Sequence, residues 1–264
     1  MKDIERAGVR TRYLDSGGEG PTLILLHGLG ADHEMWRPQI DRYPAEGYRL
    51  LVPDLRGHGE SSRVGSLSVQ DWVEDVLALV HAESLPRYGL LGVSMGGIVA
   101  QGVAIADQGR LGALVLCDTF MDLEGLGERL LGRAILGSLR VFRLLGRKRF
   151  AETAAGAYPE DSPAREYFLR LSREADMRQI ILARKAVNRV RHKAQLSEVR
   201  TPTLHLVGDG PGKFFTELNR KVSRVMPESR LEILPGGMDP SNLVVPQEFD
   251  TRVLPFLSET LSGG

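Results

Sequence analysis

The sequence contains little cysteine, few aromatic residues and no excess of charge of either sign. Cys117 is its one cysteine, so neither an internal disulfide nor a cysteine-based zinc cluster can form. Lysine and arginine together number 34, as do aspartate and glutamate. A balanced charge gives no general attraction for nucleic acid or for an anionic membrane. We therefore expect neither of them as a partner.

The sequence also lacks long apolar runs and a leader-like beginning. Residues 1–6 are charged and lead into no apolar segment, so a signal peptide is not expected. No uninterrupted apolar stretch approaches the roughly 20 residues that cross a membrane. A cytoplasmic location is the default expectation. At 264 residues, the chain can bury one substantial core with one inserted subdomain.

Short apolar runs alternate with helical segments along the chain. Residues 22–26 are continuously apolar, as expected for a strand buried on both faces, and residues 10–15 alternate like an edge strand. Ser68 has the position of an N-cap before a helix with apolar residues near a 3.6-residue period. This alternation predicts an α/β fold with a mostly parallel central sheet covered by helices on both faces. Further strands are expected at residues 48–52, 88–91, 114–117, 203–207 and 230–234.

Strand signals stop between residues 121 and 195, where leucine, arginine, alanine and glutamate dominate. We predict that residues 121–195 form a helical cap, inserted into an α/β core made of residues 1–120 and 196–264. The cap contains sixteen basic and nine acidic residues. A solvated helix surface is the simpler interpretation of this bias. The alternative is a basic lid that attracts an anionic substrate.

The chain is organised around Ser94, in the segment Gly-Val-Ser-Met-Gly-Gly at residues 92–97. An apolar run precedes this segment and a helix-compatible stretch follows it, which describes a strand, a sharp turn and a helix. Glycines are needed there because side chains would collide with the neighbouring strand and helix. The start of a helix also presents free N–H groups and a positive dipole end beside the serine. A nucleophilic serine is our interpretation, and a structural serine in a glycine-rich turn is the alternative.

Three motifs in this order resemble the α/β-hydrolase superfamily, from residue 22 to the C-terminus. They are His-Gly-Leu-Gly at residues 27–30, Pro-Asp-Leu-Arg-Gly-His-Gly-Glu-Ser at residues 53–61, and the serine segment at residues 92–97. The resemblance implies that Ser94 is the nucleophile and that the N–H groups of Leu29 and Met95 form an oxyanion hole. Such donors stabilise the charge that develops on a carbonyl oxygen.

The chain departs from the family pattern at the two other positions of the catalytic triad. The usual acid position falls on Pro211, with Asp209 two residues earlier, and the usual histidine position falls on Asp239. Removing the histidine of a serine-protease triad costs about 10⁶-fold in turnover. An ordinary carboxylate, with a pKa of about 3.9, is a weaker base than imidazole at about 6.5, although burial raises it. Triad hydrolysis is therefore disfavoured on this argument.

Other groups are candidates for supporting roles. His33, just after the oxyanion loop, is the best substitute histidine, although a solvent-facing position at a helix start is the simpler interpretation. Asp118 follows the central strand and is either an acid partner or a helix cap. Lys213 would keep Asp239 ionised if the two paired. Apolar or close-packed pocket walls are expected from Gly28, Trp36, Phe120 and Met238.

Three functions remain open, all with a small-molecule ligand and without metal or cofactor. The first is an enzyme that uses Asp239 as a base and the oxyanion hole for an enolate, in elimination, C–C cleavage, isomerisation or cyclisation. The second is an ester or lactone hydrolase that uses Ser94 with a relocated base. The third is a non-catalytic binding protein. On sequence alone we favour the first, and the oligomeric state stays open.

Overall fold

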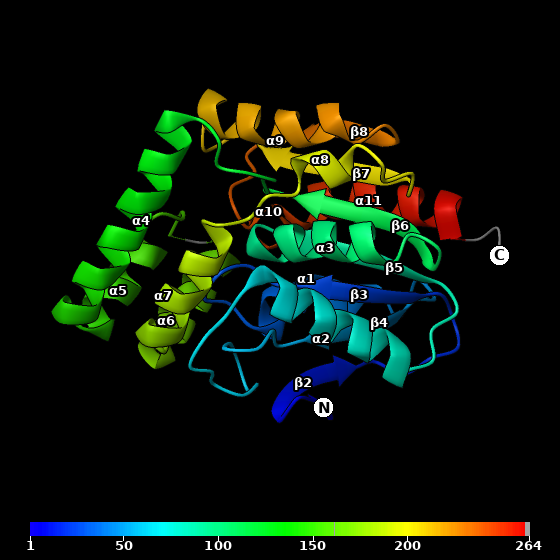
Figure 1. Ribbon diagram of the computed structural model, residues 1–264, viewed down its shortest axis with the longest axis horizontal. Helices are drawn as coiled ribbons and strands as arrows, with labels where there is room; N and C mark the ends of the chain where they lie inside the picture. Colours follow the sequence, from blue (N-terminus) through cyan, green and yellow to red (C-terminus); the bar gives the residue numbers. More distant parts are fainter. Residues whose placement is uncertain (161, 262–264) are drawn as a thin grey trace.

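The computed structural model describes residues 1–160 and 162–261 (Figure 1). Residue 161, in the expected cap, and residues 262–264, in the expected core, lie outside the described residues. One eight-stranded sheet has the order β1-β2-β4-β3-β5-β6-β7-β8. The pairs from β4 to β8 are parallel, and β1 and β2 are antiparallel. The strands are β1 (Lys2–Arg6), β2 (Val9–Asp15), β3 (Thr22–Leu26), β4 (Arg49–Pro53), β5 (Tyr88–Val93), β6 (Leu111–Cys117), β7 (Thr203–Gly208) and β8 (Ser229–Leu234).

Helices cover both faces of the sheet, which confirms the predicted fold class (Figure 1). One apolar core lies beneath α2 (Val69–Ala82) and α3 (Met95–Ala106) and includes Trp72 and Val103. The other lies beneath α11 (Pro246–Leu261) and includes Phe249. The remaining core-side helices are η1 (His33–Trp36), α1 (Arg37–Arg42), α8 (Lys193–Leu196), α9 (Lys213–Val225) and α10 (Ser241–Val244).

The central strands show why their sequences are continuously apolar. Every residue of β3, β5 and β6 is buried, because helices pack on both sides of a parallel sheet. The expected helix after Ser68 is present as α2. The Ser68 hydroxyl accepts a hydrogen bond from the N–H of Asp71, whose carboxylate accepts one from the N–H of Ser68. This reciprocal pair fixes the helix start.

Four helices between β6 and β7 lie beyond the carboxyl ends of the strands, as a group set apart from the sheet (Figure 1). They are α4 (Leu126–Leu145), α5 (Arg147–Ala155), α6 (Pro163–Glu174) and α7 (Met177–Val187). Leu139 on α4 and Ile180 and Ile181 on α7 share a small apolar cluster, against which Leu29 packs. The predicted helical character of this segment matches the described helices, while its division from the core at residues 121 and 195 stays a prediction.

No helix within the described part of the chain is both long and apolar enough to cross a membrane.

Candidate active site

Ser94 occupies a strained turn between β5 and α3. Its backbone has φ 53° and ψ −115°, a conformation that costs a non-glycine residue free energy and is concentrated at functional sites. The flanking glycines allow this turn. A Cβ on Gly92 would lie 2.4 Å from the carbonyl oxygen of Gly96, and one on Gly96 would lie 2.1 Å from that of Leu26. The turn therefore forces the Ser94 side chain out at the carboxyl end of the sheet.

Ser94 opens into a cavity of about 230 Å³ between the strand ends and the capping helices. This volume is below the range of about 300–1,000 Å³ that is typical of sites for drug-sized ligands, so the cavity suits a small molecule. Its walls come from the loops after β3, β5 and β6, from the loop before α10, and from α6 and α7. They include Gly28, Leu29, Met35, Ser94, Met95, Ile98, Phe120, Tyr158, Phe168, Arg184, Val187, Asp239 and Pro240.

The oxyanion-hole residues expected from the sequence lie beside the serine. Leu29 and Met95 both line the cavity with Ser94. A Cβ placed on Gly28 would lie 3.6 Å from the Ser94 Cβ, so the loop after β3 runs directly against the turn. Met95 is the first residue of α3, where the N–H groups have no partner within the helix. The role of these two N–H groups as an oxyanion hole stays a prediction.

Asp239 is a neighbour of Ser94, whose side chain lowers the pKa of its carboxyl group. Withdrawal from water, followed by repulsion from Asp118, outweighs this effect and raises the pKa of Asp239 to about 8. Asp239 lies on the cavity wall. The ionisable group beside the serine is therefore a carboxyl group and not an imidazole.

Asp118 is the charged neighbour that contributes to the raised pKa of Asp239. It follows β6, is 1% exposed and has φ 50°. Its Oδ1 accepts a hydrogen bond from the N–H of Gly208 at 2.9 Å, and its Oδ2 accepts one from the N–H of Ser241 at 2.8 Å. Burial raises the pKa of Asp118, and these donors lower it. Because they stabilise the ionised form, we place the negative charge of the pair on Asp118 and the proton on Asp239.

Several wall residues were not among those expected. The Tyr158 hydroxyl donates a hydrogen bond to the backbone oxygen of Asp239 at 2.7 Å, and its ring stacks on Phe168 with centroids 5.2 Å apart. These residues belong to the segment between α5 and α6 and to α6, whose placement over the strand ends no local pattern indicates. Arg184 carried one signal, since it falls on the apolar face of α7 at helical spacing from Ile180 and Val187.

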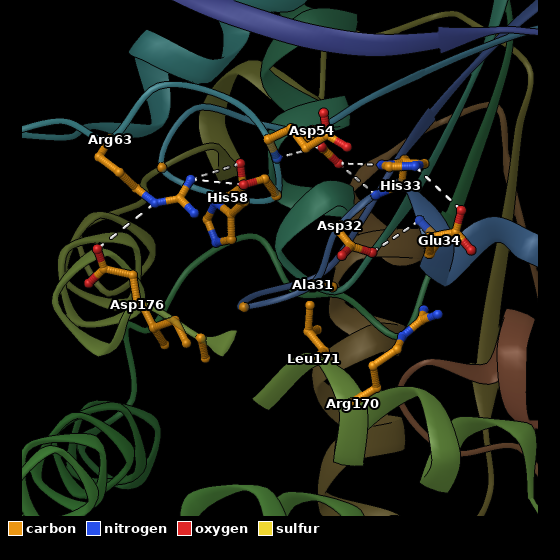
Figure 2. Close-up of a pocket in the computed structure, with 16 residues that line it drawn as sticks. Ala31, Asp32, His33, Glu34, Asp54, His58, Arg63, Arg170, Leu171 and Asp176 are labelled. Atoms are coloured by element: carbon orange, nitrogen blue, oxygen red, sulfur yellow. Dashed lines mark hydrogen bonds and ion pairs between the residues drawn. The ribbon is translucent and has the colours of Figure 1, made fainter. Parts of the chain in front are cut away.

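Within the described part of the chain, no histidine lines the cavity at Ser94. His33 instead lines a neighbouring hollow of about 390 Å³, where its ring points to Asp54 (Figure 2). Its Nδ1 lies 2.9 Å from Asp54 Oδ1, and this hydrogen bond and charge outweigh the effect of burial and raise the pKa of His33. His33 is therefore wrong as a substitute base for Ser94. His27, His58, His81, His192 and His205 are absent from the cavity wall as well.

Four other expected residues lie away from Ser94. Trp36 is fully buried in the core, in edge contact with Phe249 at 6.0 Å between ring centroids, so it is no pocket wall. Met238 packs against Gly210 and does not line the cavity. Asp209 is exposed and accepts a hydrogen bond from the N–H of Gly236. Lys213 is exposed at the start of α9 and does not contribute to the pKa of Asp239, so the proposed ion pair is wrong.

Within the described ranges, no group of three or more histidine, cysteine, aspartate or glutamate side chains is placed to hold a metal ion.

Of the residues expected as pocket walls, Gly28 and Phe120 do line the cavity.

Known proteins of similar sequence and structure share this fold. A sequence profile described as "Alpha/beta hydrolase family" matches residues 23–249. Two relatives come from Acinetobacter baylyi, an "(E)-2-((N-methylformamido)methylene)succinate hydrolase" with 33% identity over 39% of this chain and a "3-oxoadipate enol-lactonase 1" with 31% identity over 38%. The matched regions span 40% and 37% of the lengths of these relatives. A solved structure of a hydrolase from Pseudomonas aeruginosa has 27% identity and a TM-score of 0.82, with 97% of each chain covered.

Proposed function

The chain belongs to the alpha/beta hydrolase family, and we propose that it hydrolyses a small ester or lactone, with Ser94 as the nucleophile and Asp239 as the base. One observation carries the proposal. Ser94 shares the cavity wall with Asp239, a neighbouring carboxyl group whose pKa is raised to about 8. Hydrolysis of an ester or lactone is also supported by two relatives, which are named as a hydrolase and an enol-lactonase.

The raised pKa removes the main objection to a carboxylate base. An aspartate with an ordinary pKa of about 3.9 is far less basic than imidazole at about 6.5. With a pKa near 8, Asp239 is at least as basic as imidazole, and a catalytic base works best when its pKa is close to the working pH. Asp118 contributes by repelling the charge of Asp239, much as the acid of a triad stabilises a protonated histidine. About a tenth of Asp239 would be ionised at pH 7.

The proposed reaction uses only groups on the cavity wall. Asp239 accepts the Ser94 proton while Oγ forms a bond to the carbonyl carbon, and the N–H groups of Leu29 and Met95 stabilise the resulting oxyanion. The carbon–oxygen bond to the leaving group then breaks, and Asp239 donates its proton to the departing oxygen. A water molecule attacks the acyl-serine, gives a proton to Asp239, and the acid product leaves as Ser94 regains its hydrogen.

A second candidate function keeps Asp239 and dispenses with the covalent serine step. The carboxyl group of Asp239 lines the cavity itself, so it can take a proton from, or give one to, a substrate carbon. The oxyanion hole would then stabilise an enolate in elimination, C–C cleavage, isomerisation or cyclisation. In this reaction Ser94 only positions the substrate.

Two substitutions separate these functions on a panel of short methyl esters and lactones. If the proposal is correct, Ser94→Ala and Asp239→Asn each lower kcat by roughly 10³-fold or more, and a fluorophosphonate adds its mass to Ser94 in the parent protein. The matched control is Asp209→Asn, which changes an exposed carboxylate beyond the cavity and should leave turnover unchanged.

The other outcomes each contradict the proposal. A Ser94→Ala protein that keeps most of the turnover, beside an inactive Asp239→Asn protein, indicates the non-covalent reaction. A parent protein that neither turns over any ester or lactone nor reacts with the fluorophosphonate indicates a binding protein.

A further inference from the structure

Arg184 places a positive charge on the wall of the cavity that contains Ser94. It lies in the last turn of α7, is 9% exposed, and lines the cavity together with Val187 and Asp239. Among the described residues, it is the one cationic side chain on that wall. Most of the other residues on that wall are of apolar or aromatic type, with Phe120 and Phe168 among them. The presence of a positively charged side chain among such residues therefore requires an explanation.

Among the residues that the structure describes, the guanidinium group of Arg184 has no carboxylate counter-ion. Its Nε is buried and has no hydrogen-bond partner within residues 1–160 and 162–261. Burial alone lowers the pKa of Arg184 to about 10, with no carboxylate raising it, so the group still carries its charge at neutral pH. Burying an unpaired charge is costly. The fold itself therefore does not explain why this residue is an arginine.

Two other arginines with low exposure, Arg49 and Arg56, are paired with carboxylates. Arg56, which is 5% exposed, forms an ion pair with Asp75, and Arg49 forms one with Asp15 at 2.7 Å. These pairs tie the edge of the sheet and the loop after β4 to neighbouring elements. Arg184 differs because it lines the cavity and has no carboxylate partner in the described part of the chain.

Asp239 does not serve as that partner. Arg184 is absent from the groups that shift the pKa of Asp239, and Asp239 is absent from those that shift the pKa of Arg184. The two side chains share a cavity wall but form no ion pair with each other. The cavity therefore has a polar group for a reacting carbonyl at Ser94 and a separate unpaired cation.

We propose that Arg184 binds a carboxylate of the substrate, so that the substrate is a short ester or lactone with a free carboxylate group. The planar guanidinium matches a carboxylate with two parallel hydrogen bonds. A single cation in a cavity of about 230 Å³ fits a singly charged group on a molecule of a few carbon atoms. This inference rests on the proposed function for the reacting end of the substrate, while the carboxylate end stands on Arg184 alone.

Monomethyl succinate and dimethyl succinate test the proposal, because they present the same methyl ester with and without a carboxylate. The parent protein is expected to show a kcat/KM for monomethyl succinate higher by roughly tenfold or more. Arg184→Met should abolish this preference while dimethyl succinate turnover stays within a few-fold, and Arg184→Lys should keep part of it, since it retains the charge but loses the planar fork. The control is Arg189→Met, which removes an exposed charge five residues later and should leave the preference unchanged.

A binding measurement separates this inference from the proposed reaction. In calorimetric titrations, butyrate should bind the parent more tightly than butyramide does, and Arg184→Met should remove the difference. Thermal melting of Arg184→Met should show an equal or higher Tm, because loss of an unpaired buried charge does not weaken the fold. A lower Tm would indicate a structural role for Arg184.

Two mixed results have distinct meanings. Turnover of both esters without preference, together with equal binding of butyrate and butyramide, overturns the carboxylate site and leaves the hydrolase proposal standing. Binding of butyrate through Arg184 without turnover of either ester supports the carboxylate site and contradicts the hydrolase.

Discussion

The carboxyl pair of Asp118 and Asp239 makes the stability of the folded protein depend on pH. In the folded state the pKa of Asp239 is about 8, whereas in the unfolded chain it returns to about 3.9. Between these two values the folded state binds a proton that the unfolded state has lost. Stability rises with pH only where the unfolded state binds more protons. The contribution of Asp239 is therefore fully present below about pH 4 and is lost as the pH rises through 8.

Asp239→Asn should remove this pH dependence, because the amide resembles the protonated carboxyl group at every pH. We expect the free energy of unfolding of the parent to fall relative to that of Asp239→Asn from about pH 5 to pH 8.5, with a slope of up to about 1.4 kcal/mol per pH unit. Urea denaturation across this range measures the difference, and Asp209→Asn supplies a matched exposed control. A difference that stays constant with pH would show that Asp239 ionises normally in the folded state.

The position of Asp239 could be predicted from the sequence, but its basicity could not. The family pattern aligns Asp239 with the histidine position, and the structure places Asp239 and Ser94 on the same cavity wall. Its raised pKa depends on burial and on Asp118, which lies 121 residues earlier in the chain and is held by backbone donors from two other segments. Lys213, expected to keep Asp239 ionised, is exposed elsewhere. Such contacts between distant segments of the chain cannot be predicted from a local sequence pattern.

At the scale of single elements, the turn between β5 and α3 is the part of the site that sequence predicts best. Gly96→Ala should destabilise the protein by about 1–3 kcal/mol or more, because its Cβ would lie 2.1 Å from the carbonyl oxygen of Leu26. The atom that the new Cβ would meet belongs to the backbone, so no flexible side chain can move aside to relieve the clash. The same displacement should carry Ser94 away from Asp239 and lower turnover in proportion.

Gly137→Ala is the matched control for Gly96→Ala. Gly137 lies inside α4, and a Cβ there would meet no atom within 4 Å, so alanine should stabilise that helix by up to about 1 kcal/mol. Chemical denaturation of both variants, with circular dichroism as the probe, measures the two effects. Equal stability of Gly96→Ala and the parent would mean that the turn tolerates a side chain and is not strained.

The elements that the sequence did not indicate share a physical cause. β1 (Lys2–Arg6) consists mainly of exposed, charged residues at the edge of the sheet, where no burial imposes an apolar pattern and charge protects the edge from further pairing. The capping helices present the reverse case. Their amphipathic pattern predicts helices, but which of them covers Ser94 depends on tertiary packing, so Tyr158, Phe168 and Arg184 were not expected in the site.

At the scale of the whole molecule, the sheet gathers the reacting groups from distant parts of the chain. Leu29, Ser94, Asp118 and Asp239 all follow strands or lie in loops at the same edge, where ligands of open α/β sheets bind. This convergence follows from the parallel strand order, so it could be predicted once the strands were recognised. The cap completes the cavity and supplies its cation. In the proposed reaction, this frame keeps the nucleophile at Ser94 while the carboxyl group of Asp239 takes the part of the histidine.

If the frame is intact apart from its base, Asp239→His should restore a conventional triad. The imidazole would replace the carboxyl group beside Ser94. Asp118, which is held by the N–H groups of Gly208 and Ser241 and whose charge acts on residue 239, is expected to accept its other N–H. Because the pKa of imidazole is about 6.5, the midpoint of the pH profile of kcat/KM on dimethyl succinate should fall from about 8 in the parent by more than one unit. Turnover at pH 7 should therefore rise. The paired control adds Asp118→Asn, which should remove the gain by leaving the imidazole without its acid partner. An unchanged midpoint in Asp239→His would show that another group, and not residue 239, titrates in the reaction.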